Sequence, residues 1–167
     1  HYEGGAQHNA QFYVRPSDGR VLFFPHDLDF YPGDPRTGIV GSPDLQRLLA
    51  LPGNARRFYA HLRDILDTTY NAAYMVRWRD EFARRVPTQD WAGHHDFLVA
   101  RSAWVRSGAP DAVDTRFPDV PFAITSDDGG PLVIAAPSLI LRGRASLTVD
   151  ALRAVEAGVA LAVNFAD

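Results

Sequence analysis

Two short apolar runs separated by a turn signal constrain the fold of this chain more than any other feature. "AQFYV" (10–14) and "RVLFF" (20–24) are rich in aromatic and β-branched residues, and "RPSDG" between them supplies Pro, Asp and Gly. This composition is typical of two strands joined by a tight turn. We predict a β-hairpin with strands at about 9–15 and 20–25. Since apolar residues fall on both faces, we expect the hairpin to be covered on both sides as a core element.

The middle of the chain carries helix signals. "SPDLQRLLA" begins with Ser42 as N-cap and Pro43 at the first helical position, and Pro52 stops the helix. Between 54 and 86 apolar residues recur at helical spacing, with a break near "TTYN", and Asp90 is placed to cap a further helix. We therefore predict a helical layer. Its core stripes would contain Phe58, Leu62, Ile65, Leu66 and Tyr70, then Tyr74, Trp78 and Phe82, then Trp91, Leu98 and Val105.

The C-terminal part has a different pattern of apolar residues. Short apolar runs, "PFAIT", "PLVIA", "SLILRG" and "GVALAV", are punctuated by Gly and Pro, and "DDGG" indicates a hairpin turn. This spacing favours a small antiparallel, immunoglobulin-like β-sandwich, although the segment is shorter than the ~100 residues of such a domain. We predict an α+β fold with two parts, 1–116 and 117–167, the second being truncated.

Composition excludes several classes of function. The 167 residues carry a net charge of −3, a sequence pI near 6.0 and no cysteine. These values give no attraction to nucleic acid and provide no thiolate metal site. No apolar run approaches the roughly 20 residues that span a bilayer. All 17 basic side chains are arginine, and the chain starts without Met, so we expect further polypeptide upstream and downstream.

Asn and Asp side chains, which can supply oxygen ligands, flank the open end of the predicted hairpin in the sequence. Asn9 and Asp27 are each about nine residues from the turn, so paired strands would bring them together, and Asp29 follows closely. Amide and carboxylate oxygens suit Mg²⁺ or Mn²⁺. The alternative is a strand-to-loop exit in which the carboxylates cap backbone N–H groups and Asn9 ties down a strand end. The register decides whether Asn9 and Asp27 pair directly.

These motifs resemble the CotH kinase family, atypical kinase-like proteins of spore coats and cell surfaces. The resemblance lies in "HN" before an aromatic strand, the "PSDGR" turn, "FFPHDLDF" and "PGNARRFYAHLRDILDTTYN", over about residues 1–106. It implies part of a kinase C-lobe that transfers phosphate from ATP, with Mg²⁺ or Mn²⁺, to Ser/Thr of a surface or coat protein. By the same resemblance, Asn9 and Asp27 would hold the metal and its nucleotide, and Asp29 would be a ligand or an orienter. It also implies a secreted or cell-surface protein.

Departures from the family pattern favour a second interpretation. His26 stands where the family has Trp, and Glu3 stands near the position of the catalytic Asp. Either Glu3 serves as the catalytic residue or an Asp lies just upstream of His1. The chain also has no lysine to contact phosphates. The alternative is a catalytically inactive pseudokinase, or a structural scaffold module of a secreted multidomain protein.

The remaining polar residues favour structural roles. His8 and His26 lie near the same end of the hairpin, but their spacing fits no strong zinc motif. His94 and His95 sit on a predicted helix, one facing solvent and the other partly buried. A last set could contact phosphate but is more typical of solvated helix and loop surfaces: Arg36, Arg56 and Arg57.

Overall fold

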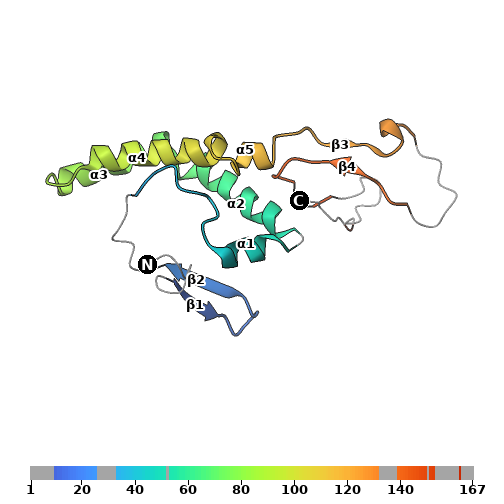
Figure 1. Ribbon diagram of the computed structural model, residues 1–167, viewed down its shortest axis with the longest axis horizontal. Coiled ribbons are helices and arrows are strands. Elements are labelled where there is room, and N and C mark those ends of the chain that lie inside the picture. Colours follow the sequence, from blue (N-terminus) through green and yellow to red (C-terminus); the bar gives the residue numbers. More distant parts are fainter. Residues whose placement is uncertain are drawn as a thin grey trace.

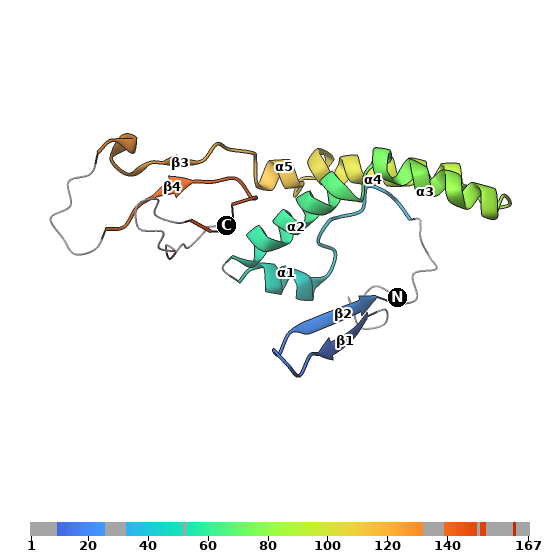
Figure 2. The same ribbon diagram turned by 180° about the vertical axis from the view of Figure 1, so that it is seen from behind.

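The computed structural model describes residues 10–25, 33–51, 53–131, 139–149, 151–152 and 162. Within them the chain is mixed α+β, with a hairpin at the N-terminal side, a layer of helices and a small two-stranded pairing in the C-terminal part (Figure 1). The view from behind shows the hairpin below the helical layer and the C-terminal strands at the left end of that layer (Figure 2). The α+β class predicted from the sequence is confirmed.

The hairpin forms where the apolar runs predicted it. Strand β1 (Ala10–Val14) pairs antiparallel with β2 (Val21–Pro25), with Ala10 opposite Pro25 and Val14 opposite Val21. Gly19 has a φ of 69° in the connecting turn, a value that glycine adopts without the steric cost of a Cβ. Backbone N–H of Gly19 donates to the carbonyl of Arg15, which closes the turn.

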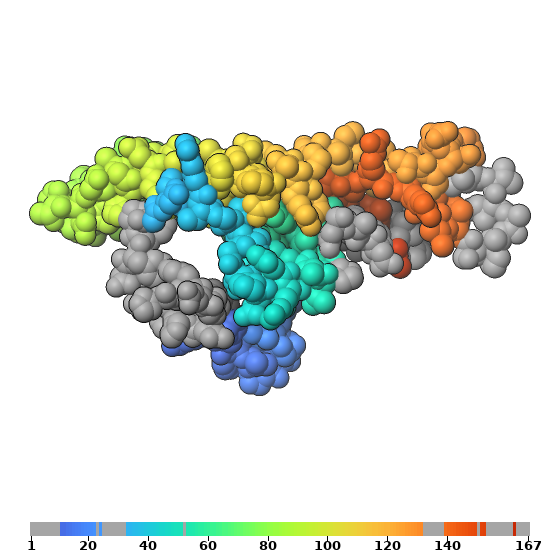
Figure 3. Space-filling view, viewed as in Figure 1, coloured from blue at the N-terminus to red at the C-terminus, as the bar shows by residue number. Residues whose placement is uncertain are grey.

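The expectation that the hairpin is covered on both sides is wrong for its described side chains. Phe12 and Val21 on one face are 63% and 62% exposed, and Tyr13 and Phe24 on the other are 50% and 51% exposed. In the space-filling view the strands form a lobe beside α1 (Pro43–Leu49) (Figure 3). Alternation along a strand shows which faces are apolar, whereas cover depends on what else packs there.

The helix boundaries follow the capping and stop signals. Helix α1 starts at Pro43, directly after Ser42, although the Ser42 side chain makes no capping hydrogen bond. Helices α2 (Asn54–Thr68) and α3 (Ala72–Arg85) break where "TTYN" predicted it, and Asn71 caps α3 by accepting from the Tyr74 N–H. Asp90 caps α4 (Trp91–Ala103) by accepting from the Gly93 N–H. These predictions are confirmed.

Two shorter helical elements follow α4. A π-helical turn (Trp104–Gly108) follows directly, and α5 (Val113–Arg116) comes after it. The ring of Trp104 is the reason for glycine at position 108, because a Cβ on residue 108 would lie 2.8 Å from that ring. Helices α3 and α4 run side by side and extend away from the C-terminal strands (Figures 1 and 2).

The core lies where α2 meets α5 and the end of α4. Tyr59 anchors it: its ring lies 5.3 Å from that of Phe117, and its hydroxyl donates to the Asp111 carbonyl at 3.0 Å. Arg63 is also buried and donates to the Phe117 carbonyl at 2.7 Å. The buried apolar members of this cluster are Ala55, Tyr59, Leu66, Val105, Val113, Phe117 and Leu147.

The C-terminal part is attached to α2. Strand β3 (Ala123–Ile124) pairs with β4 (Gly143–Arg144), and Leu147, three residues further on, belongs to the helical core. "DDGG" forms a 3₁₀ turn (Ser126–Gly129) in which Asp127 and Asp128 have positive φ. Because β3 pairs with residues near 143, this turn is not the tight hairpin connection that the sequence predicted. The immunoglobulin-like sandwich and the boundary at 116/117 stay predictions.

Among the helices formed by the described residues, none combines the length and the apolar character that a bilayer span requires. This agrees with the expectation from the apolar runs.

Candidate functional site

The residues predicted to hold metal and nucleotide lie outside the described residues. These are Glu3, Asn9, Asp27 and Asp29, together with the neighbouring His8 and His26. In the parts of the chain that are described, no group of three or more His, Cys, Asp or Glu side chains is arranged to hold a metal ion. The predicted ligand set therefore stays a prediction.

The described part of the hairpin ends close to these residues in the sequence. The last described pair is Ala10 opposite Pro25. Asn9 directly precedes Ala10 in the sequence, and Asp27 follows Pro25 by two residues. The described register ends at this pair, so whether Asn9 and Asp27 lie close together stays a prediction.

The other end of the hairpin holds an exposed charge cluster. The Asp18 carboxylate accepts from Arg15 Nε at 2.8 Å and from the Arg20 backbone N–H at 3.2 Å. Hydrogen bonding to the Arg15 guanidinium holds the pKa of Asp18 below its usual range. Both side chains belong to the turn, so this cluster is a structural clamp at the opposite end from the predicted metal ligands.

The three arginines considered for phosphate contact differ in burial. Arg36 and Arg57 are exposed, as expected for solvated surfaces. Arg56 is buried, and its Nη2 donates to the carbonyls of Ser146 and Val149, the latter at 3.1 Å. The expectation of a solvated Arg56 is therefore wrong, because this guanidinium donates to backbone acceptors 90 and 93 positions away in the sequence, beyond the reach of any local pattern.

A concave surface lies between α3 and α4, and we call it the α3–α4 groove. Its volume is about 410 Å³, and its wall is mostly apolar and aromatic. The residues that line it are Tyr70, Met75, Trp78, Arg79, Phe82, Trp91, His94, His95 and Leu98. His94 and His95 are both half-buried here, which corrects the expectation that one of them faces solvent.

Aromatic rings form a continuous stack along this groove. Ring centroids are 6.1 Å apart between Trp78 and Phe82, 5.2 Å between Phe82 and Trp91, and 5.7 Å between Trp91 and His94. Yet Trp78 and Phe82 stay 37% and 42% exposed, and Tyr74 stays 44% exposed. The prediction of a buried stripe is wrong for these three residues, because helical spacing predicts a common face but not a partner that covers it.

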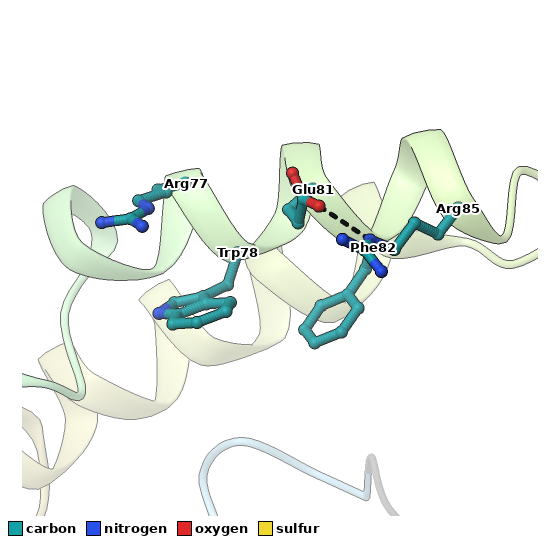
Figure 4. A pocket seen from close by; sticks show the side chains of 5 residues that line it. All are labelled: Arg77, Trp78, Glu81, Phe82 and Arg85. Atoms are coloured by element: carbon teal, nitrogen blue, oxygen red, sulfur yellow. Dashed lines mark hydrogen bonds and ion pairs between the residues drawn. The ribbon is translucent and has the colours of Figure 1, made fainter.

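A charged row runs beside the aromatic stripe on α3. Figure 4 shows Trp78 and Phe82 projecting to the same side of the helix, with Arg77, Glu81 and Arg85 along its other edge. The Arg85 Nε donates to Glu81 at 2.7 Å, and the Arg77 guanidinium carbon lies 5.6 Å from the Trp78 ring centroid. The groove is thus apolar inside and charged at its rim.

Comparison of this chain with protein-family models, with curated proteins and with solved structures yields no match. Any assignment of function must therefore come from its own residues.

Proposed function

We propose that this chain is the C-lobe portion of a CotH-like kinase, which transfers phosphate from ATP to Ser or Thr of a surface or coat protein. The observation that supports this proposal is the hairpin register. Ala10 pairs with Pro25, and Asn9 and Asp27 stand one and two residues beyond that pair in the sequence, in the order Asn, hairpin, Asp. Protein kinases use an Asn and a later Asp in the same order to hold their metal ions.

The chemistry of the ligand set fits this proposal. Amide and carboxylate oxygens are the ligands that Mg²⁺ and Mn²⁺ prefer, and these ions commonly take only one or two protein ligands beside nucleotide phosphates. The bound ion would neutralise charge on the β- and γ-phosphates. Asn9 and Asp27 would position it, and Asp29 would hold them in place.

The transfer itself requires a group that receives a proton. The serine or threonine oxygen of the acceptor forms a bond to the γ-phosphorus, the bond from that phosphorus to the bridging oxygen breaks, and ADP leaves. The hydroxyl proton would pass to Glu3, or to an aspartate upstream of His1. A carboxylate placed within hydrogen-bond reach of the acceptor hydroxyl can serve in this role.

Metal–nucleotide binding provides the direct test. The 167-residue chain would be titrated into MnATP while the water proton relaxation rate is recorded, because binding slows the tumbling of the complex. We expect relaxation to increase for the wild type, and Asp27→Asn to weaken binding more than about 10-fold, since even partners beyond the metal ligands cost 10- to 100-fold.

Asp18→Asn is the matched control, because it removes the same charge at the opposite end of the same hairpin. It should leave MnATP binding unchanged. A longer polypeptide that contains this chain would then be tested for phosphate transfer. It would be incubated with ATP and a serine-rich peptide, and the mass of the intact peptide would be measured. Equal MnATP binding by wild type, Asp27→Asn and Asp18→Asn would refute the metal site.

A scaffold role is the second candidate, and the exposed apolar surfaces favour it. Hairpin residues such as Phe12 and Val21, and α3 residues such as Phe82, present large apolar side chains to solvent. Patches of this kind are typical of interaction sites. A chain that binds no MnATP but retains its fold would support this role in a multidomain protein.

A further inference from the structure

The α3–α4 groove combines an apolar floor with a rim that carries net positive charge on α3. Helix α3 carries four arginines and only two acidic residues. Both acids are engaged: Asp80 pairs with Arg79 at 2.7 Å, and Glu81 pairs with Arg84 and Arg85. Arg77 is exposed and has no ion pair with any residue in the described part of the chain. The rim therefore attracts carboxylates.

We infer that this groove docks an acidic amphipathic helix of another protein. Two antiparallel helices with a groove between them offer a third helix the usual ridge-and-groove contact. The exposed rings of Tyr74, Trp78 and Phe82 follow one another at intervals of four residues, over about 12 Å of helix axis. The partner would match this length with apolar side chains at i, i+4 and i+7, and a carboxylate beside Arg77.

The groove is already arranged for such a contact. Trp78, Phe82 and Trp91 are held in one stack, so their side chains lose little conformational freedom when a partner binds. Tryptophan and arginine are also the residues most enriched among those that dominate binding energy at interfaces. Electrostatic complementarity at Arg77 would then select acidic partners over basic ones.

Among the described helices, none suits the groove as a helix contributed by a second copy of this chain. On the other described helices, the large apolar side chains that are exposed stand singly: Leu48 on α1, Ile65 on α2 and Val99 on α4. Within the described residues, only α3 carries an exposed apolar stripe two turns long. Pairing α3 with itself would bring two helices of net positive charge together. Like charges at such a contact oppose association. The inference is independent of the proposed kinase activity.

The three tryptophans allow a site-resolved test. The chain would be labelled with 5-fluorotryptophan, and its ¹⁹F NMR signals assigned with single Trp→Phe variants. The probes are two helical peptides with the same apolar residues, one with Glu and the other with Lys at the flanking positions. We expect the Glu peptide to shift the signals of Trp78 and Trp91 and to leave that of Trp104, whose indole donates to the Thr37 carbonyl, unchanged.

Charge reversal tests the role of the rim. Arg77→Glu should weaken binding of the Glu peptide about tenfold and strengthen binding of the Lys peptide, because it replaces an attraction with a repulsion. Arg57→Glu makes the same change at an exposed position of α2 and should leave both affinities as in the wild type. Phe82→Ala should weaken both peptides, since it removes part of the apolar floor.

Three results would overturn the inference. The first is equal affinity for the Glu and Lys peptides, and the second is an equal shift of the Trp104 signal. The third is a concentration-dependent dimer in sedimentation that Phe82→Ala abolishes, which would assign the groove to a second copy. Circular dichroism of each variant establishes that lost binding does not reflect lost fold.

Discussion

At the scale of single residues, buried arginines link distant parts of the chain. Arg63 donates to the Phe117 carbonyl and lies 3.6 Å from an Asp114 oxygen, and Arg56 donates to the Val149 carbonyl. A guanidinium is buried only when its N–H groups find acceptors, because desolvation is otherwise too costly. Nothing local in "NARRF" distinguishes buried Arg56 from exposed Arg57. Tertiary contacts decide which of the two is structural.

The turn of the hairpin should respond to pH through Asp18. Its pKa is lowered in the folded chain, chiefly by hydrogen bonding to Arg15. The stabilisation is therefore present above the unfolded-state pKa, near 4, and is lost as pH falls through the folded value. Arg15→Ala should raise the Asp18 pKa toward its ordinary range, as measured by ¹³C NMR of the carboxyl group.

High salt serves as the control for that experiment. Because the pair is exposed, about 1 M salt should screen it and move the wild-type midpoint toward that of the variant. Identical Asp18 midpoints in the wild type and in Arg15→Ala at low salt would contradict the assignment of Arg15 as the cause.

At the scale of elements, local signals determined where structure starts and stops. Pro43 begins α1, Asn71 caps α3 and Asp90 caps α4, each by chemistry that acts within a few residues. The hairpin follows from its turn and two apolar runs for the same reason. In contrast, the pairing of β3 with β4 joins residues about 20 positions apart, and short apolar runs did not reveal that partner.

Gly143 makes the pairing of β3 with β4 possible. A Cβ at this position would lie 2.6 Å from the Ala123 carbonyl oxygen, so Gly143→Ala should push the strands apart. We expect a loss of about 1–3 kcal/mol in the free energy of local opening, typical of overpacking. Hydrogen exchange at the Thr125 amide, which donates to the Arg142 carbonyl at 2.8 Å, reports this opening.

Gly41→Ala is the matched control, since nothing lies within 4 Å of its added Cβ. Exchange at Thr125 should stay as in the wild type. If Gly143→Ala left that exchange rate unchanged as well, close backbone approach would not be the reason for glycine at 143.

At the scale of the whole molecule, the C-terminal part and the helices share one core. Leu147 is 6% exposed and lies in the same cluster as Ala55 and Tyr59 of α2. The Arg56 guanidinium spans the same junction by binding carbonyls on both sides of Leu147. The attachment therefore combines apolar packing with hydrogen bonds, which favours cooperative unfolding of α2 with segment 143–149.

Leu147→Ala should test this cooperativity. Truncating a buried leucine costs about 2–5 kcal/mol, so we expect the amides of α2 to exchange faster together with those of 143–149. Leu141→Ala, at a position that is 46% exposed, should have a much smaller effect. Faster exchange in 143–149 alone would show that the C-terminal part unfolds separately.

The metal ligands predicted from the sequence depend on hairpin geometry. Turn position and strand length predict that Asn9 and Asp27 approach each other, and this stays a prediction because both lie outside the described residues. The aromatic groove was missed, because the same spacing that marks a buried stripe also marks an uncovered one. The signal that could have distinguished it is the density of arginine beside the aromatics of α3.

The sequence by itself determined the α+β class, the hairpin, the helix boundaries and the apolar faces. Each of these depends on interactions within a few residues: turn conformation, capping, proline geometry and side-chain periodicity. Only the tertiary structure decided which apolar faces are covered, which arginine is buried and where Leu147 packs. Those outcomes depend on contacts between residues far apart in the chain, and their free energies are set by the partner that each surface meets.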